Sequence, residues 1–227
     1  MSIKFQEKVK IITPSEVPVL KVFEGRPNYN MQKILESGRT PLDMKGFMQR
    51  RLYDTSDAQT LRDNVFRTAS PLFGDPNGSG EVVIVSYKNN ETARKLVNSL
   101  NPDSNIKNYS LVVSKDVYES IKEQESMIIS RDVANALRID FYSKPKTRAE
   151  FWEFQVEGDK DLNKDYGAMI DKKTDTSFSK NRGIWLPDTK GMRLFWLWPV
   201  DYNFSSAGGY DLNKYGGRLV GKLNLLR

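Results

Sequence analysis

The sequence contains no cysteine and no histidine. Without cysteine the chain cannot form disulfide bonds, thiolate zinc sites or a cysteine nucleophile. Without histidine it lacks the most common general base and transition-metal ligand, which excludes hydrolysis by a Ser–His–Asp triad. An enzyme of this composition would depend on carboxylates, lysine or tyrosine, and no spacing singles out the pair of carboxylates that a glycosidase needs. We therefore expect a protein that is not an enzyme, with no cofactor and no catalytic or metal-binding residues.

Long apolar runs are also missing. No stretch approaches the roughly 18 apolar residues of a membrane-spanning helix. The first residues, MSIKFQEKVKIITPSEVPVLKVF, are charged throughout and contain two prolines, unlike a secretory signal peptide. Charged residues make up 28% of the chain and apolar residues 38%, which is typical of a soluble globular protein. The sequence does not decide whether the protein lies on a cell, on a virion or in the cytoplasm.

The chain is basic, with 35 Lys and Arg against 29 Asp and Glu and a net charge of +6. A basic protein is a candidate for nucleic-acid binding, but a nucleic-acid footprint needs clustered charge. Here the basic residues are spread along the chain, with only short clusters at 50–51, 144–148 and 172–173. A mildly basic, solvated surface is the favoured interpretation. A basic nucleic-acid-binding or virion structural protein is the alternative.

The first half of the chain predicts short strands and a few helices. TPLDMKGFMQRRL predicts an amphipathic helix with Thr40 as its N-cap, Pro41 at the first helical position and Asp43 in the first turn. After the glycine- and proline-rich SPLFGDPNGSGE, the β-branched run EVVIVSY predicts a buried strand. Asn90 is then expected to cap a helix in NETARKLVNSL.

Two segments of the middle region echo each other. LVVSKDVYESI and MIISRDVANAL share an apolar triplet, a serine, a basic residue, Asp and Val, and they predict helices capped by Ser114 and Ser130. TRAEFWEFQV predicts a further helix capped by Thr147, with Phe151 and Trp152 in the core.

Residues 157–182 are polar and charged, which predicts a long surface insertion. Within it, DLNKDYG has the alternating acidic and amide residues of a calcium loop. Tyr166 stands where that loop needs glycine, and Lys172 stands where it needs the bidentate glutamate. We therefore interpret DLNKDYG as a turn.

The composition changes from Gly183 onward. GIWL and MRLFWLWPV predict strands, the second apolar on both faces until Pro199, and GGRLVGKLN predicts another strand. Between them lies DYNFSSAGGYDLN, whose Tyr, Phe, Ser, Asn and Gly match the composition of an adaptable recognition surface. The same aromatic side chains would equally suit a β-rich core, so composition alone leaves both interpretations open.

The arrangement MR…W…SSAGGYDL…YGGRLVG, over residues 192–221, resembles the variable proteins of diversity-generating retroelements, in particular those of archaea and their viruses. The resemblance implies a C-type lectin fold and a C-terminal repeat that an error-prone reverse transcriptase rewrites at template adenines. Such mutagenesis yields residues such as Asn, Tyr, Asp, Ser, Gly, Ala, Phe and Leu. Fourteen of the fifteen residues from Asp201 to Tyr215 belong to the reachable set, and Lys214 does not. The Glu-Pro-Asn, Gln-Pro-Asp and Trp-Asn-Asp motifs of calcium-dependent lectins are absent, so calcium-dependent sugar binding is not expected.

The resemblance also implies which residues form the framework and which face a ligand. The implied scaffold positions are Arg193, Gly216, Gly217, Arg218, Leu219 and Val220. The implied ligand-binding positions are Phe195, Trp196, Trp198, Asp201, Tyr202, Asn203, Phe204, Ser205, Tyr210, Asn213 and Tyr215. Adenine mutagenesis does not yield tryptophan, which marks Trp196 and Trp198 as framework or codon-fixed positions within that surface.

These inferences combine into one expectation for residues 1–227, a single α+β domain with a C-type lectin-like fold. It would have small antiparallel sheets, flanking helices and a long insertion, with its N- and C-terminal strands close together. Residues 1–80 would supply N-terminal strands and a helix, and residues 81–227 the lectin-like core with its variable region at about 193–221. The expected function is that of a non-enzymatic, receptor-type protein whose hypervariable surface binds a protein or cell-surface ligand. Neither the ligand nor the oligomeric state follows from the sequence.

Overall fold

The computed structural model describes residues 20–53, 56–140, 142–174, 182–188, 190–200, 207–213 and 217–223. Helices are interspersed with strands that pair antiparallel in nearly every case, which confirms the expected α+β class. The strands are β1 (Leu20–Gly25), β2 (Arg39–Pro41), β3 (Phe66–Gly74), β4 (Val82–Val85), β5 (Ile106–Lys107), β6 (Ser110–Leu111), β7 (Ser126–Ile129), β8 (Ile184–Trp185), β9 (Gly191–Leu197), β10 (Ala207–Tyr210) and β11 (Gly217–Leu223). The helices are α1 (Pro27–Glu36), α2 (Met44–Leu52), α3 (Ser56–Asp63), α4 (Glu91–Asn98), α5 (Lys115–Lys122), α6 (Arg131–Ile139), α7 (Pro145–Gln155) and α8 (Lys160–Thr174).

Strand β9 lies at the centre of the larger sheet, whose order is β5-β6-β9-β3-β4-β7. It pairs with β3 along one side. Along its other side it pairs with β6 at Met192 and with β10 from Leu194 to Leu197. Every residue of β9 is buried, as the apolar run before Pro199 predicts.

The larger sheet separates two hydrophobic clusters. Met192 and Leu194 of β9 belong to one cluster. Phe195 and Leu197 of the same strand belong to the other. The four residues of β4 are divided between the clusters in the same alternating way. Because these strands are buried on both faces, their sequences do not alternate between apolar and polar residues, and Arg193 is the one charged residue in β9 and β4.

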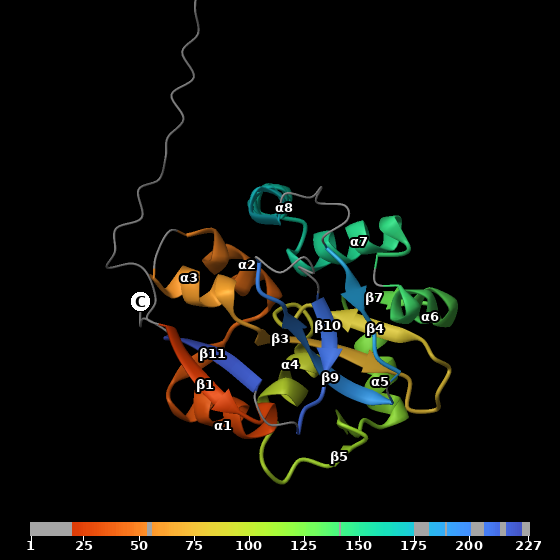
Figure 1. Ribbon diagram of the computed structural model, residues 1–227. Coiled ribbons are helices and arrows are strands. Elements are labelled where there is room, and N and C mark those ends of the chain that lie inside the picture. The colour runs from red at the N-terminus through yellow and green to blue at the C-terminus, as the bar shows by residue number, and fades with distance from the viewer. Residues whose placement is uncertain are drawn as a thin grey trace, which may run out of the picture.

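Helices cover the sheet on both sides (Figure 1). Helices α2, α3, α6, α7 and α8 contribute buried side chains to the cluster that contains Phe195. Helices α1, α4 and α5 contribute to the cluster that contains Met192. Each cluster therefore consists of one sheet face and the helices packed on it.

A smaller sheet joins the two ends of the described chain, in the order β1-β11-β2. Strand β1 pairs antiparallel with β11 from Leu20 opposite Lys222 to Gly25 opposite Gly217, and the two strands lie side by side in Figure 1. The expected proximity of the N- and C-terminal strands is therefore confirmed.

The helix predicted from Thr40 begins later than expected. Thr40 and Pro41 belong to β2, which pairs with β11. The N-cap is Asp43, whose carboxylate accepts a hydrogen bond from the Gly46 backbone N–H at 2.7 Å. The predicted cap at Thr40 was wrong because pairing with a strand distant in sequence decides the conformation of these residues.

The polar region 157–182 was predicted to be a surface insertion, but helix α8 occupies most of it. Leu162, Tyr166 and Ile170, spaced four residues apart, are buried against the cluster that contains Phe195. The segment DLNKDYG lies inside this helix, so its interpretation as a turn was wrong. Here a narrow apolar stripe determines the structure, although most residues are charged or polar.

Helix α7 begins at Pro145, with Lys144 in the cap position at φ 53°, rather than after a cap at Thr147. Proline favours the first helical position because its fixed φ suits the helix and its missing N–H costs nothing there. Phe151 and Trp152 are buried, as predicted.

The two echoing segments form the predicted strand-to-helix units, β6 with α5 and β7 with α6. Ser114 caps α5 by accepting a hydrogen bond from the Val117 N–H. Ser130 occupies the N-cap position of α6, but its side chain makes no capping hydrogen bond. Asn90 caps α4 through the Ala93 N–H at 2.9 Å, as predicted.

The contact between β6 and β9 generates a test on two glycines with positive φ. Gly191 has φ 117°, and a Cβ there would lie 2.2 Å from the Leu111 carbonyl oxygen. Gly38 has φ 69°, and a Cβ there would meet nothing within 4 Å. We expect Gly38→Ala to lower the free energy of unfolding by about 1 kcal/mol, the cost of a left-handed backbone alone. Gly191→Ala should lower it by about 3 kcal/mol, because β6 must also move away from β9. Urea denaturation measures both, and equal losses would contradict the close contact.

Candidate functional site

Some of the expected ligand-binding residues belong to the part of the chain that the structure describes, and these differ in how deeply they are buried. Trp198 follows β9 and Asn213 follows β10, and both side chains are half-buried. Tyr210 belongs to β10, where its backbone pairs with Leu194 of β9. Asp201, Tyr202, Asn203, Phe204, Ser205 and Tyr215 lie outside the described residues.

Phe195 is not a surface residue. Its side chain is 0% exposed, and its ring lies 5.2 Å from the ring of Phe151 on α7. Alternation along β9 directs this position into the core, where it cannot contact a ligand. The prediction that Phe195 binds a ligand was therefore wrong.

Trp196 and Trp198 form an aromatic pair at the end of β9. Their ring centroids are 4.6 Å apart and the rings meet nearly edge to face at 80°. Trp196 is buried and lies over Gly208 of β10, where a Cβ would come within 3.0 Å of the indole. Trp196 is therefore part of the framework, whereas the half-buried Trp198 supplies partly open aromatic surface.

Arg193 joins β9 to the two segments beside it. Its Nε donates to Ser110 Oγ at 2.9 Å and its Nη2 donates to the Asn108 carbonyl oxygen at 3.0 Å, both in the β5–β6 hairpin. Its Nη1 pairs with Asp211 Oδ1 at 3.0 Å, just after β10. Burial lowers the pKa of the Arg193 guanidinium, and Asp211 opposes this shift. Arg193 has the scaffold role that the resemblance implies.

The chain after β10 is also fixed by its backbone. The Leu212 N–H donates to the Tyr109 carbonyl oxygen at 2.9 Å, and the Leu212 carbonyl oxygen accepts from the Asn28 N–H at 3.5 Å. The Leu212 side chain is fully buried in the cluster that contains Met192. Because Leu212 is held by these contacts, the position of the adjacent, half-buried Asn213 is fixed as well.

The implied scaffold positions in β11 are also packed. Leu219 and Val220 are buried, one in each hydrophobic cluster. Gly217 lies against the Arg67 guanidinium so closely that a Cβ at this position would overlap it. Arg218 is half-buried and pairs with Glu24 of β1 at 3.1 Å, while Gly216 lies outside the described residues.

The described residues offer no group of three or more Asp or Glu side chains arranged to hold a metal ion. Over the same residues, no helix is long and apolar enough to cross a membrane.

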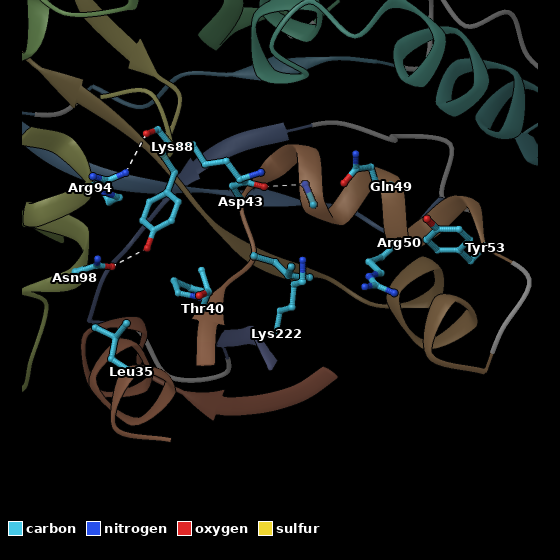
Figure 2. A pocket seen from close by; sticks show the side chains of 14 residues that line it. Leu35, Thr40, Asp43, Gln49, Arg50, Tyr53, Lys88, Arg94, Asn98 and Lys222 are labelled. Carbon is cyan, nitrogen blue, oxygen red and sulfur yellow. Dashed lines mark hydrogen bonds and ion pairs between the residues drawn. The ribbon is translucent and has the colours of Figure 1, made fainter. Parts of the chain in front are cut away.

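The structure also forms a pocket that the sequence did not indicate, of about 630 Å³ (Figure 2). Arg50, Lys88, Arg94 and Lys222 line it, together with the carboxylate of Asp43. These side chains come from α2, the turn after β4, α4 and β11. No local motif connects them, so only the three-dimensional fold reveals this pocket.

The arrangement of sheets and helices is that of the C-type lectin fold. The chain matches a solved structure reported as "Accommodation of massive sequence variation in Nanoarchaeota by the C-type lectin fold", with a TM-score of 0.59. The match covers 90% of this chain and 97% of that chain at 16% sequence identity. The expected fold is therefore confirmed. No protein-family model and no curated protein matches the sequence.

The Arg193 contacts generate a stability test. Arg193→Gln should lower the free energy of unfolding by about 3 kcal/mol, because it leaves the largely buried Asp211 carboxylate without its cation. Lys95→Gln is the control, because the side chains of Lys95 and its partner Glu91 are 75% and 63% exposed, and an exposed pair contributes less than about 1 kcal/mol. Urea denaturation compares the two variants. A loss for Arg193→Gln no larger than that for Lys95→Gln would contradict the scaffold role.

Proposed function

We propose that the chain is a single-domain binding protein without enzymatic activity, whose ligand site lies on the C-terminal segment 193–221. The observation that carries this proposal is the contrast between a fixed framework and the residues attached to it. Arg193, Leu219 and Val220 are buried and bonded into the fold. Trp198 and Asn213, beside them in sequence, remain partly open. Binding residues on such connections can change without altering the packed core.

We further propose that a retroelement diversifies this segment. Support comes from residue types, since nearly every residue from Asp201 to Tyr215 belongs to the set that adenine mutagenesis yields. The matched structure adds support, because it is described as the same fold accommodating massive sequence variation. A near-copy of codons 193–221 beside a reverse-transcriptase gene, differing only at adenines, would be the expected genomic arrangement.

A protein or another cell-surface molecule is the ligand class that this composition favours. Tyrosine and tryptophan provide large, rigid contact areas, while Asn, Ser and Gly provide adaptable hydrogen bonds. Trp198 is the described aromatic residue best placed to act as an anchor. Truncating a good anchor costs about 2 kcal/mol of binding free energy or more.

A nucleic-acid ligand has less support than the net charge indicates, because several arginines are inside the fold. The buried arginines are Arg51, Arg67, Arg148, Arg182 and Arg193. Asp43 and Asp75 are the buried carboxylates among the described residues. Among the described residues, more positive than negative charge is therefore buried, and these arginines do not add to a basic surface.

Two libraries of variants test whether the C-terminal segment can change its residues and bind new ligands while the fold stays intact. The first library replaces residues 201–205 and Asn213 with the residue types that adenine mutagenesis yields. We expect most members to keep the wild-type melting temperature within a few degrees and some to bind proteins that the parent does not bind. The matched library changes Met192, Leu194 and Phe195, and it should lose cooperative unfolding because these side chains form the core. Thermal melts and surface display measure both properties.

Two outcomes would count against this function. Loss of cooperative unfolding in most members of the first library would show that the segment packs into the core. Binding to DNA or RNA with an affinity that falls with salt as for several neutralised phosphates would favour the nucleic-acid alternative.

A further inference from the structure

The pocket of about 630 Å³ is lined by residues outside segment 193–221. Its walls come from β2, α2, the turn after β4 and α4, and Lys222 of β11 lies beyond segment 193–221. Its volume falls within the roughly 300 to 1,000 Å³ that is usual for small-molecule sites. It is therefore a second candidate site, independent of the first.

Positive charge dominates this pocket. Four cationic side chains line it, from Arg50, Lys88, Arg94 and Lys222, against the single carboxylate of Asp43. In Figure 2 the side chains of Lys222 and Arg50 lie beside each other, with Lys88 and Arg94 across the opening. Such a concentration of one sign of charge in a concave site attracts anions.

The Asp43 carboxylate is already engaged on both oxygens. Its Oδ1 accepts the capping hydrogen bond from the Gly46 N–H at 2.7 Å. Its Oδ2 lies 3.3 Å from Lys88 Nζ. Among the described residues that line the pocket, no other carboxylate is present to compensate Arg50, Arg94 and Lys222.

The Lys222 side chain is half-buried and lies near the charges of two other pocket cations. Its pKa is lowered, first by burial and then by the neighbouring charges of Arg50 and Lys88. A bound anion would relieve both effects, because it would replace lost hydration and offset the repulsion among the cations.

The remaining walls are partly rigid and partly apolar. Tyr87 is buried, and its hydroxyl donates to Asn98 Oδ1 at 2.8 Å. Arg94 donates to the Lys88 carbonyl oxygen at 3.1 Å, which fixes its guanidinium at the edge of the pocket. Leu35 adds apolar surface. A few placed polar groups on a partly apolar lining are typical of small-molecule sites.

We propose that this pocket binds a small organic phosphate, with the phosphate group held by Lys222 and Arg50 and the organic part against the Leu35 and Tyr87 walls. Two neighbouring cations with no paired carboxylate suit a dianionic phosphate better than a single carboxylate. Guanidinium and ammonium groups are the usual side chains that bind phosphate in proteins. The cations surround one concave space rather than following a stripe, which favours a small molecule over a nucleic-acid strand.

Isothermal titration calorimetry with adenosine 5′-monophosphate, at constant ionic strength, tests the proposal. Adenosine is the neutral control ligand, and it should produce no binding heat. Lys222→Gln and Arg50→Gln should each weaken the affinity about tenfold or more, the effect of losing one charged hydrogen bond. Lys146→Gln makes the same change of charge at a side chain that is 91% exposed on α7, and it should bind as the wild type does.

Thermal melts in potassium phosphate provide a second measurement. Phosphate stabilises many folded proteins by exclusion from their surface, so the informative quantity is the difference between variants. The wild type and Lys146→Gln should gain more in Tm than Lys222→Gln does. Without phosphate, Lys222→Gln should melt at or above the wild-type temperature, because it removes a cation from cationic neighbours. That result would also show that lost binding is not lost folding.

Three outcomes would overturn the proposal. The first is no binding of adenosine 5′-monophosphate to the wild type. The second is equal affinity in Lys222→Gln and Lys146→Gln, which would place the ligand elsewhere. The third is a single-stranded oligonucleotide that binds more tightly, with a steep salt dependence and no response to Lys222→Gln, which would indicate a diffuse nucleic-acid surface. None of these outcomes tests ligand binding by segment 193–221. The phosphate proposal can therefore be wrong while the proposed function is right, and the reverse.

Discussion

The structure depends on one strand that is buried on both faces. Strand β9 supplies Met192 and Leu194 to one hydrophobic cluster and Phe195 and Leu197 to the other. Each of its edges is also occupied, by β3 on one side and by β6 and β10 on the other. A strand enclosed in this way has no position at which a polar substitution could reach solvent without disturbing a cluster or a neighbouring strand. Its sequence is therefore tightly constrained by packing.

The packed strand is also bonded to the segments on either side of it. Arg193 satisfies its donors on Ser110, Asn108 and Asp211, so the strand is bonded to the hairpin on one side and to the chain after β10 on the other. Leu212 then anchors that chain in the core. The described framework is therefore bonded and packed both at β9 and just after β10. These contacts stabilise the C-type lectin fold beside the segment that we propose to bind a ligand.

The sequence predicted elements whose signal is local and missed those decided by distant contacts. The buried β4, the Asn90 cap and the apolar β9 follow from a few adjacent residues. Thr40 had a sound local signal for a helix cap, but pairing of β2 with β11 moved the cap to Asp43. Helix α8 was missed because its buried stripe is narrow among charged residues. Phe195 was assigned to the ligand surface by the resemblance, although MRLFWLWPV itself predicts a strand that is apolar on both faces, and the alternation along β9 places its side chain in the core.

Positive charge in this protein has three separate environments, and they differ in what neutralises it. Buried Arg51 donates to neutral oxygens, the Leu61 carbonyl oxygen and the Tyr166 hydroxyl, and so stabilises the fold through hydrogen bonds. Surface cations such as Lys95 pair with nearby acids, where water weakens both charges. Of the pocket cations, Arg50 and Lys222 have neither arrangement, because they are partly removed from water and the Asp43 carboxylate is already occupied by Gly46 and Lys88. A folded chain retains such uncompensated charge at a cost to its stability, and cost of this kind is characteristic of functional sites. The same reasoning that assigns the buried arginines to structure therefore assigns the pocket cations to a ligand.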